Sequence, residues 1–243
     1  MPEKETIVYI WLRDRYKGQV EQIFTPDNIR RLLLFLPPFI LSLSFHEYAH
    51  SWAANKLGDP TSKNLGRHTL DPMVHITPFG TIIFPSIGLL MGGFLFGWAK
   101  PVPVDSRNFK EPMKHMAYVA AAGPISNVIL AFLCCALLAM VRSYVVSGAG
   151  AVSPVIAAGH EMLELAVTLN LFLAFFNLIP VPPLDGSRII QGFVPYSTAR
   201  KIDEWGETGQ WILLIMIFTG VLKYLAIPVY ISRNILFSIF GLI

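Results

Sequence analysis

Three long stretches of the chain contain no aspartate, glutamate, lysine or arginine. They are residues 72–99, 115–141 and 165–184. A helix that spans a membrane needs about 20 consecutive apolar residues, so each stretch is long enough to cross a bilayer. The composition agrees, since 53% of the residues are hydrophobic and 14% are charged, whereas soluble domains average about 45–50% and about 25%. We therefore expect a membrane protein.

Prolines and glycines divide the apolar sequence into segments. The expected apolar segments are 31–57, 76–98, 116–141, 161–180 and 208–231. Residues 76–98 contain seven prolines and glycines, which suits either a membrane span or a re-entrant hairpin. Residues 101–104 are predicted to be extended, because Pro101 and Pro103 disfavour a helix there.

Charge and cysteine usage exclude several classes of protein. The net charge of +3 is spread among loops, and no stripe of basic residues alternates with aromatic ones. A nucleic-acid partner is therefore not expected. Cys134 and Cys135 are adjacent in an apolar run, which favours helix packing over a disulfide framework. The N-terminus lacks the short apolar core and cleavage site of a signal peptide, so we expect none to be removed.

The sequence HEYAH at residues 46–50 lies in the second half of the first apolar segment. On a helix, His46 and His50 are one turn apart and share a face, so both imidazoles can bind one metal ion. Glu47 is not needed as a ligand and can act as a general base. Two interfacial histidines beside a snorkelling glutamate are the alternative. However, an acid at the centre of a membrane helix costs about 2.5–3.5 kcal/mol, which favours a functional role.

Two histidines leave a zinc ion short of a third protein ligand. Asp185 ends an uncharged run of 20 residues, and Pro180, Pro182 and Pro183 before it are expected to break the helix. An aspartate that only caps the next helix is the alternative interpretation. The missing ligand favours Asp185 as a metal ligand.

Three motifs in chain order resemble the site-2 protease family of intramembrane zinc metallopeptidases. They are HEYAH at 46–50, GPISN at 123–127 and NLIPVPPLDG at 177–186. Together with GWAKPVPV at 97–104, the likeness covers roughly residues 35–190 and is greatest to the short prokaryotic branch without PDZ or CBS domains. The resemblance implies that His46, His50 and Asp185 hold one Zn²⁺ ion per chain. It also implies that Glu47 is the catalytic acid and base.

Three further residues are candidates for binding substrate or an oxyanion. Asn127 and Asn177 lie among apolar neighbours, where an unpaired amide is costly, and the resemblance suggests that such asparagines face the active site. Hydrogen bonding between helices is the alternative for both. His75 is a candidate for lining the site or closing its mouth. His160 receives no role, because the acids beside it suit the start of a helix.

The basic residues of the connectors predict the orientation in the membrane. Residues 99–114 contain four lysines and arginines, 186–207 contain three, and 143–160 contain none. Cytoplasmic loops are enriched in these residues, so the first two connectors are predicted to be cytoplasmic and the third external. The direction of the first helix stays open at this point. The expected location is the inner or plasma membrane, with several crossings.

We therefore expect an all-α polytopic membrane protein with about five to six membrane segments, a three-helix catalytic core and a short extended or re-entrant insert. Residues 31–207 form the metallopeptidase core, between an N-terminal surface segment, 1–30, and C-terminal membrane helices, 208–243. The expected function is intramembrane zinc proteolysis, with the bilayer and a transmembrane protein substrate as partners. The extended residues 98–105 are predicted to clamp the unwound substrate by strand addition. The sequence leaves open whether the protein forms a homo-oligomer.

Other functions fit the sequence less well. Diiron desaturases need more than the six histidines of this chain. Zinc peptidases of the prenyl-protein type use a glutamate as third ligand, and no glutamate downstream is a convincing candidate. A catalytically idle metal-binding adaptor or transporter is the main alternative, but it has no need of Glu47 beside its first ligand.

Overall fold

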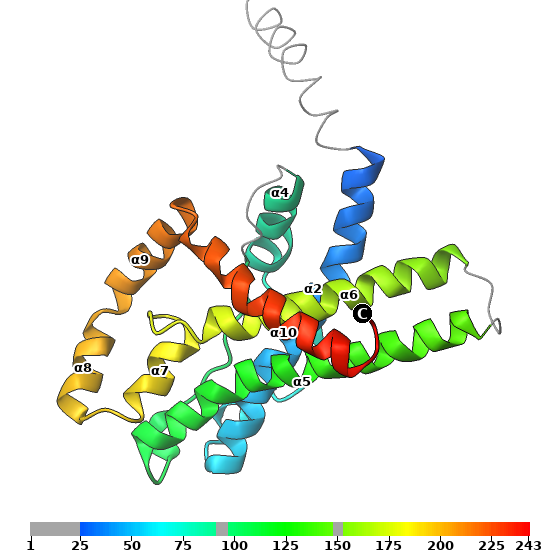
Figure 1. Cartoon of the computed structure of the whole chain (residues 1–243). Helices are drawn as coiled ribbons and strands as arrows, with labels where there is room; N and C mark the ends of the chain where they lie inside the picture. Colours follow the sequence, from blue (N-terminus) through cyan, green and yellow to red (C-terminus); the bar gives the residue numbers. More distant parts are fainter. Residues whose placement is uncertain (1–24, 91–96, 148–152) are drawn as a thin grey trace, which may run out of the picture.

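The protein is described here by a computed structural model that covers residues 25–90, 97–147 and 153–243. Its helices are α2 (Pro26–Leu57), α3 (Thr61–Asn64), α4 (Phe84–Leu90), α5 (Pro112–Val146), α6 (Pro154–Asn177), α7 (Asp185–Gln191), α8 (Tyr196–Glu204), α9 (Gly206–Phe218) and α10 (Ala226–Ile239). Shorter helical turns are η1 (Pro72–Val74), η2 (Pro78–Ile83), η3 (Ser106–Asn108) and η4 (Val221–Leu225). No residue in the described ranges belongs to a β-strand, in agreement with the all-α prediction (Figure 1). Residues 1–24, most of the predicted surface segment, lie outside these ranges.

Helix α2 carries the HEYAH motif and is capped at both ends. The Thr25 hydroxyl accepts a hydrogen bond from a backbone N–H of the first turn, and Pro26 opens the helix, as is usual at N-termini. Gly58 ends it with φ 111°, a left-handed conformation that glycine adopts at little cost. Pro37 and Pro38 lie inside the helix, which continues beyond them and keeps both histidines on one face.

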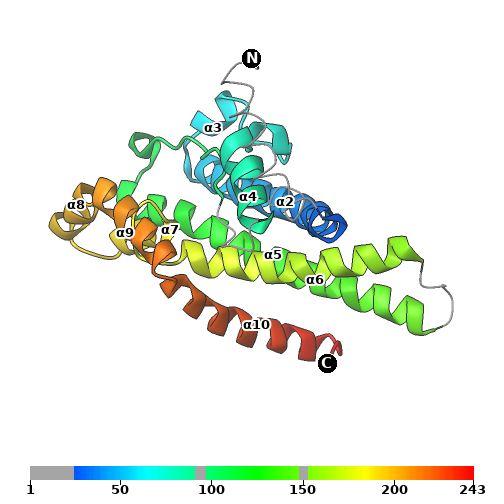
Figure 2. The same ribbon diagram turned by 90° about the horizontal axis from the view of Figure 1, so that it is seen from above.

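Helices α2, α5 and α6 pack against one another and form the helix core of the protein (Figures 1 and 2). Helix α2 runs antiparallel to α5. His50, late in α2, is bonded to Val119 near the start of α5, whereas Ser42, earlier in α2, accepts a hydrogen bond from Asn127 further along α5.

Helix α2 runs parallel to α6. Arg30 pairs with Glu161 near the start of both helices, and Ser42 is bonded to Asn170 further along both. An apolar cluster fills the space between them and consists of Phe35, Phe39, Leu43, Leu169 and Leu173. The end of α2, the start of α5 and the short helix α7 therefore lie at the same end of the helix core (Figure 1).

Helix α10 covers α5 and α6 from the side opposite α2 (Figure 2). The buried residues of this contact are Ala131, Cys134, Cys135, Leu138, Ala166, Val167, Leu171, Val229 and Phe237. Cys134 and Cys135 are free thiols in this cluster, which is the packing role predicted from the sequence.

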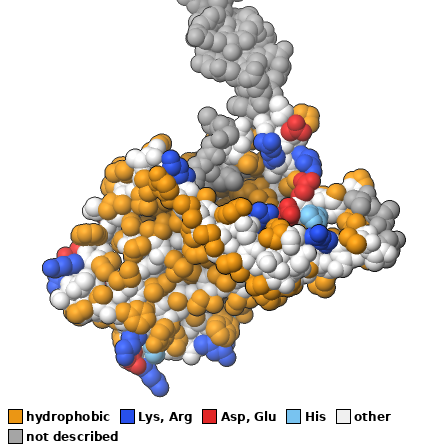
Figure 3. Space-filling view, viewed as in Figure 1, with side chains coloured by type: hydrophobic (Ala, Val, Ile, Leu, Met, Phe, Trp, Pro, Cys, Tyr) orange, Lys and Arg blue, Asp and Glu red, His pale blue; other side chains and the backbone are white. Residues whose placement is uncertain are grey.

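Three described helices are long and apolar enough to span a membrane: α2, α5 and α6. The helices at 206–218 and 221–239 are bent by 79° and count as a fourth span only if taken together. The expected five to six segments are therefore not confirmed by the described residues. Hydrophobic side chains cover most of the face seen in Figure 3, and the charged ones lie mainly toward its margins. This surface is that of a membrane protein.

Gly80 and Trp98, near the two ends of the predicted insert, lie next to each other. The Trp98 N–H donates to the Gly80 carbonyl at 3.1 Å, and the Thr81 hydroxyl donates to the Trp98 carbonyl at 2.8 Å. Residues 91–96 between them lie outside the described ranges. Residues 97–105 that follow have no helical structure, as predicted for 101–104.

Candidate active site

The two histidines and the aspartate predicted as metal ligands lie together. His46 and His50 bring their Nε2 atoms to 3.0 Å from each other. Asp185, the first residue of α7, places Oδ2 3.1 Å from His46 Nε2 and 3.4 Å from His50 Nε2. Two imidazoles and one carboxylate are a donor set that suits catalytic zinc and leaves one position open.

Hydrogen bonds on the far ring nitrogens orient both imidazoles. His50 Nδ1 lies 2.7 Å from the Val119 carbonyl oxygen, and because a carbonyl can only accept, this nitrogen carries the proton. His46 Nδ1 lies 2.7 Å from Asn127 Oδ1. Both rings therefore turn the lone pair of Nε2 toward Asp185, which is the arrangement of metal-binding histidines.

This convergence creates a place for a cation. Asp185 Oδ2 is buried without a hydrogen-bond partner, and in neutral imidazoles that carry their proton on Nδ1 the two Nε2 atoms have no proton to donate. Lone pairs that face one another in a buried site repel unless a positive charge lies between them. Ligand atoms at about 2.0–2.2 Å from a tetrahedral zinc are about 3.3–3.6 Å apart, close to the separations found here. The site fits zinc.

Glycine allows Asp185 to reach the histidines. Helix α6 ends at Asn177, and the chain turns back through seven residues before α7 begins. A Cβ atom on Gly186 would collide with the carbonyl oxygens of Leu178 and Ile179. The glycine after the aspartate is therefore needed for the close return of α7 to the end of α6.

A second glycine makes room for the ligands. Gly123 on α5 faces the two imidazoles, and a Cβ atom there would lie 2.5 Å from His50 Cε1 and 2.6 Å from His46 Cε1. Such distances are well inside van der Waals contact. The glycine of the GPISN motif therefore acts by having no side chain.

Glu47 lies next to the first ligand on α2 and is 9% exposed. Its Oε2 accepts a hydrogen bond from the Val102 N–H at 2.8 Å. The catalytic candidate is thus held by the extended segment, a contact 55 residues away in sequence that the sequence analysis did not predict.

Residues 98, 100 and 102 of the 97–105 segment attach it to the rest of the protein at alternate positions. Besides the contacts of Trp98, the Lys100 N–H donates to the His75 carbonyl at 2.7 Å, and the Lys100 carbonyl accepts from Arg67 at 2.7 Å. Val102 follows with its bond to Glu47. Because the N–H and C=O groups of successive residues of an extended chain point to opposite sides, one edge of this segment is occupied and the other is turned away.

The tentative site residues have different surroundings. Asn127 is fully buried and bonded to the predicted ligand His46, and its expected contact with substrate or an oxyanion stays a prediction. Asn177 donates to the Leu173 carbonyl of its own helix at 3.0 Å, so its expected role stays a prediction. His75 is fully buried, with Nε2 2.7 Å from the Thr69 carbonyl. It supports the 97–105 segment, and a role at the mouth of the site stays a prediction.

Two residues near the site were missed by the sequence analysis. Asn170 is fully buried and bonded to Asn127, and Ser42 is bonded to Asn170. The argument that singled out Asn127 also applies to Asn170, an amide in the middle of an apolar helix.

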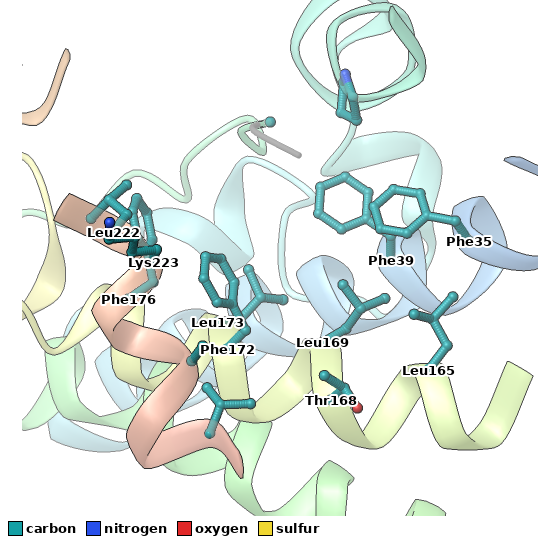
Figure 4. Close-up of a pocket in the computed structure, with 14 residues that line it drawn as sticks. Phe35, Phe39, Leu165, Thr168, Leu169, Phe172, Leu173, Phe176, Leu222 and Lys223 are labelled. Atoms are coloured by element: carbon teal, nitrogen blue, oxygen red, sulfur yellow. The ribbon is translucent and has the colours of Figure 1, made fainter. Parts of the chain in front are cut away.

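An apolar cavity of about 370 Å³ lies between α2, α6 and the α10 region (Figure 4). Phe35, Phe39, Leu169 and Phe172 are among its walls, and Thr168 and Lys223 bring the few polar atoms. Its lining suits hydrocarbon more than a polar ligand.

Comparison with known proteins agrees with this geometry. The model of peptidase family M50 matches residues 34–158 and 145–222. The chain belongs to peptidase family M50. It is 40% identical over 189 residues to YwhC of Bacillus subtilis, covering 78% of this chain and 82% of YwhC. The resemblance to site-2 proteases is thereby confirmed.

More distant relatives carry the same description. Rip2 of Mycolicibacterium smegmatis is 25% identical over 203 residues, which cover 81% of this chain and 73% of Rip2. MJ0392 of Methanocaldococcus jannaschii is 34% identical over 85 residues, which cover 34% of this chain and 24% of MJ0392. The names of YwhC, Rip2 and MJ0392 all contain the words zinc metalloprotease. No solved structure matches the chain. Membership of the family makes this M50 protein a zinc metalloprotease.

Proposed function

We propose that this M50 protein hydrolyses peptide bonds in or near the transmembrane segments of other membrane proteins. The observation that carries the proposal is the position of the ligands along the helices. His46 and His50 lie within α2, which is long and apolar enough to span a membrane, and Asp185 follows 20 uncharged residues. Ionisable groups in such segments are costly and mark functional sites.

Each residue of the site has a separate role in the proposed reaction. A zinc ion on His46, His50 and Asp185 supplies Lewis acidity and a water molecule with a pKa near ~7. Glu47 takes the proton of the attacking water and transfers it to the leaving amine. The Val102 N–H holds Oε2 of Glu47, so we assign the proton transfer to Oε1.

The substrate is assigned to the outer edge of the 97–105 segment. A helix in a bilayer hides its carbonyl groups in hydrogen bonds, so the substrate has to unwind before cleavage. Strand addition would then pair the unwound peptide with a free backbone edge. The outer positions are Ala99, Pro101 and Pro103, and because proline has no N–H this edge mainly accepts hydrogen bonds. The substrate strand is therefore the donor.

The membrane arrangement follows from the helix core. The connectors 99–114 and 186–207 lie at one end of that core, and the end of α5 and the start of α6 lie at the other (Figure 1). We place the first end in the cytoplasm, on the basis of its lysines and arginines. The hydrogen bond between Gly80 and Trp98 favours the re-entrant alternative for the predicted insert over a membrane span. The inner or plasma membrane of the cell is the proposed location.

Glu47→Gln tests the proposed activity. The substitution keeps the size of the side chain and removes the base, so zinc content stays at one ion per chain. General acid and base catalysis is typically worth about 10²- to 10⁴-fold, and cleavage of a transmembrane substrate in liposomes should fall by that factor. Asp185→Ala is the matched variant that should lose zinc as well as activity. Equal turnover by wild type and Glu47→Gln would contradict the mechanism.

A second comparison tests where cleavage occurs. The same scissile sequence is offered within a membrane-spanning peptide in liposomes and within a soluble peptide. We expect the wild type to cleave the membrane-spanning form faster. Faster cleavage of the soluble form would refute the intramembrane proposal and leave the zinc metalloprotease assignment intact.

A further inference from the structure

A chain of buried polar side chains connects the ligand His46 to the interior of the helix core. Asn127 Oδ1 lies 2.7 Å from His46 Nδ1, and Asn127 Nδ2 donates to Asn170 Oδ1 at 2.8 Å. Asn170 Nδ2 donates to the Ser42 hydroxyl at 2.8 Å, which donates to the Pro38 carbonyl at 2.7 Å. Both asparagines are fully buried, and Ser42 is 1% exposed. The chain links α2, α5 and α6.

The direction of every hydrogen bond in this chain is set by backbone carbonyl groups. Asn170 Nδ2 also donates to the Ala166 carbonyl at 2.8 Å. Because a carbonyl only accepts, Asn170 cannot rotate its amide by 180° without placing two oxygens against each other. Its Oδ1 is therefore fixed as the acceptor that faces Asn127.

The same argument fixes Asn127. Its Nδ2 lies between Asn170 Oδ1 and the Ser42 carbonyl, the latter at 3.3 Å. Both of these atoms are acceptors, so Nδ2 belongs on this side and Oδ1 belongs toward His46. An oxygen in that place requires a proton on His46 Nδ1, which in a neutral imidazole leaves the lone pair on Nε2, where the metal would bind.

We propose that Asn170 is a positioning residue that, through Asn127, keeps His46 in the tautomer able to bind zinc. Without Asn170, the Asn127 amide loses its main reason to prefer one orientation. In the reversed orientation its N–H donates to Nδ1, and the proton of His46 moves to Nε2, which then cannot bind a metal. The inference rests on His46 as a zinc ligand and not on proteolysis within the membrane.

The use of amides in this chain suits a membrane protein. A metal-binding histidine often donates its other N–H to a carboxylate. A carboxylate at this depth would add a second buried negative charge close to Asp185, at the cost of ionisable groups in a bilayer. The amide chain has no charge and ends on carbonyl groups of the helices, so the imidazole is oriented without that cost.

The first test replaces Asn170 by Leu, which has a similar size and no hydrogen-bonding atoms. Removing a partner that orients a metal ligand typically weakens metal binding by about 10- to 100-fold. We expect such a rise in the dissociation constant of zinc, measured by competition with a chelator on the purified full-length protein. Asn170→Asp is the conservative variant. A buried, protonated aspartic acid can accept from Asn127 and donate to the Ala166 carbonyl, so zinc affinity should return close to that of the wild type.

The second measurement reads the tautomer directly. The ¹⁵N chemical shifts of histidine distinguish a protonated ring nitrogen from an unprotonated one, and they can be recorded on zinc-free protein labelled only at histidine. The signals of His46 are identified by their loss in His46→Gln. We expect a proton on Nδ1 in the wild type and in Asn170→Asp, and a mixture of tautomers in Asn170→Leu.

A matched control separates this role from general stability. Ser44 is as buried as Ser42 and likewise donates to the carbonyl four residues earlier in α2, but it contacts neither asparagine in the described hydrogen bonds. Ser44→Ala should therefore leave the zinc affinity and the His46 tautomer unchanged.

Each result has a defined meaning. Weaker zinc binding with a mixed tautomer in Asn170→Leu, and recovery in Asn170→Asp, support the proposal. Unchanged zinc binding, or weaker binding with the proton still on Nδ1, overturns it. If Asn170→Leu does not fold, failure of the folded Asn170→Asp variant to keep the wild-type tautomer overturns it as well. None of these readouts involves cleavage, so they stand apart from the test of the proposed function.

Discussion

At the scale of single residues, the site depends on side chains that are absent as well as on those that are present. Gly123 lies where a methyl group would occupy the space of two imidazole carbons. The position is helical, so a left-handed backbone is not the reason for the glycine. The physical requirement is the close approach of α5 to the metal ligands.

Gly123→Ala should weaken zinc binding. Overpacking of a close-packed interior costs about 1–3 kcal/mol, which corresponds to about a 5- to 150-fold loss of zinc affinity if the ligands absorb the displacement. The dissociation constant of zinc can be measured by chelator competition. Gly159→Ala on α6 is the control, since a Cβ atom there meets nothing within 4 Å. An unchanged zinc affinity in Gly123→Ala would show that α5 can move away without disturbing the ligands.

At the scale of elements, the 97–105 segment connects the catalytic candidate Glu47 to the polar connector after α2. One end is attached to Gly80, and its middle is attached to His75, Arg67 and Glu47. At the other end, the Asp105 N–H donates to the buried carboxylate of Asp59 at 2.8 Å. The segment thus has a defined position without belonging to a sheet.

Val102→Pro removes the N–H that holds Glu47. An extended backbone next to Pro101 and Pro103 tolerates proline, so the segment should keep its course. We expect a lower kcat at unchanged zinc content, because the base is no longer fixed toward the site. In Val104→Pro, the same change is made at an amide without a described hydrogen bond, and the loss should be much smaller. Equal kcat in Val102→Pro and wild type would show that the hydrogen bond between Val102 and Glu47 does not contribute to catalysis.

Asp59 makes the attachment of this segment sensitive to acid. Burial raises the pKa of Asp59, but hydrogen bonds from Thr61, Asn108 and the Asp105 amide outweigh it, so its pKa lies below the usual value. A carboxyl group with a lowered pKa in the folded state stabilises that state above its unfolded pKa of about 3.9. The contribution declines below that value and is lost as the pH falls through the lower pKa of the folded state.

We therefore expect Asp59→Asn to have a lower thermal unfolding temperature than the wild type at pH 6, and the gap to close below about pH 4. Circular dichroism melts of both proteins in detergent measure it. Other titrating groups, including the zinc ligands, are present in both proteins and cancel in the difference. A gap that does not depend on pH would show that Asp59 acts through packing alone.

At the scale of the whole molecule, the helix directions relate the first helix to the others. The sequence left the direction of α2 open, but its contacts make it parallel to α6 and antiparallel to α5. The start of α2 therefore lies beside the start of α6. If the connector 143–160 is external, the start of α2 is external as well.

Cysteine labelling tests this arrangement in intact cells and inverted vesicles. The parent variant for this experiment lacks Cys134 and Cys135. Single cysteines then replace Ile29, Val155 and Ser106 in turn. Ile29 and Val155 are exposed and should react from outside, whereas Ser106 should react only from the cytoplasmic side. Labelling of Ser106 from outside would reverse the topology, and labelling of Ile29 and Val155 from opposite sides would contradict the packing of α2 on α6.

The sequence predicted those parts of the site that lie within one motif or at the end of one apolar run. His46 and His50 share a helix face, and the structure brings both to Asp185, as expected. The contacts of Glu47 with Val102 and of Asn127 with Asn170 were not predicted, because they depend on how helices and the extended segment pack. No local pattern reports that packing. The number of membrane segments depends on how bent helices are counted, and the described residues do not confirm it.

The separation of the ligands along the chain also sets an order in time. His46 and Asp185 are 139 residues apart, and Asn127 and Asn170, which are hydrogen-bonded to His46 and to each other in turn, come from the two helices between them. At a synthesis rate of about 5–20 residues per second, roughly 7–28 s pass between the two ligands. A half-made chain carries two histidines and no complete zinc site. The predicted ligand set is therefore incomplete until Asp185 has been synthesised.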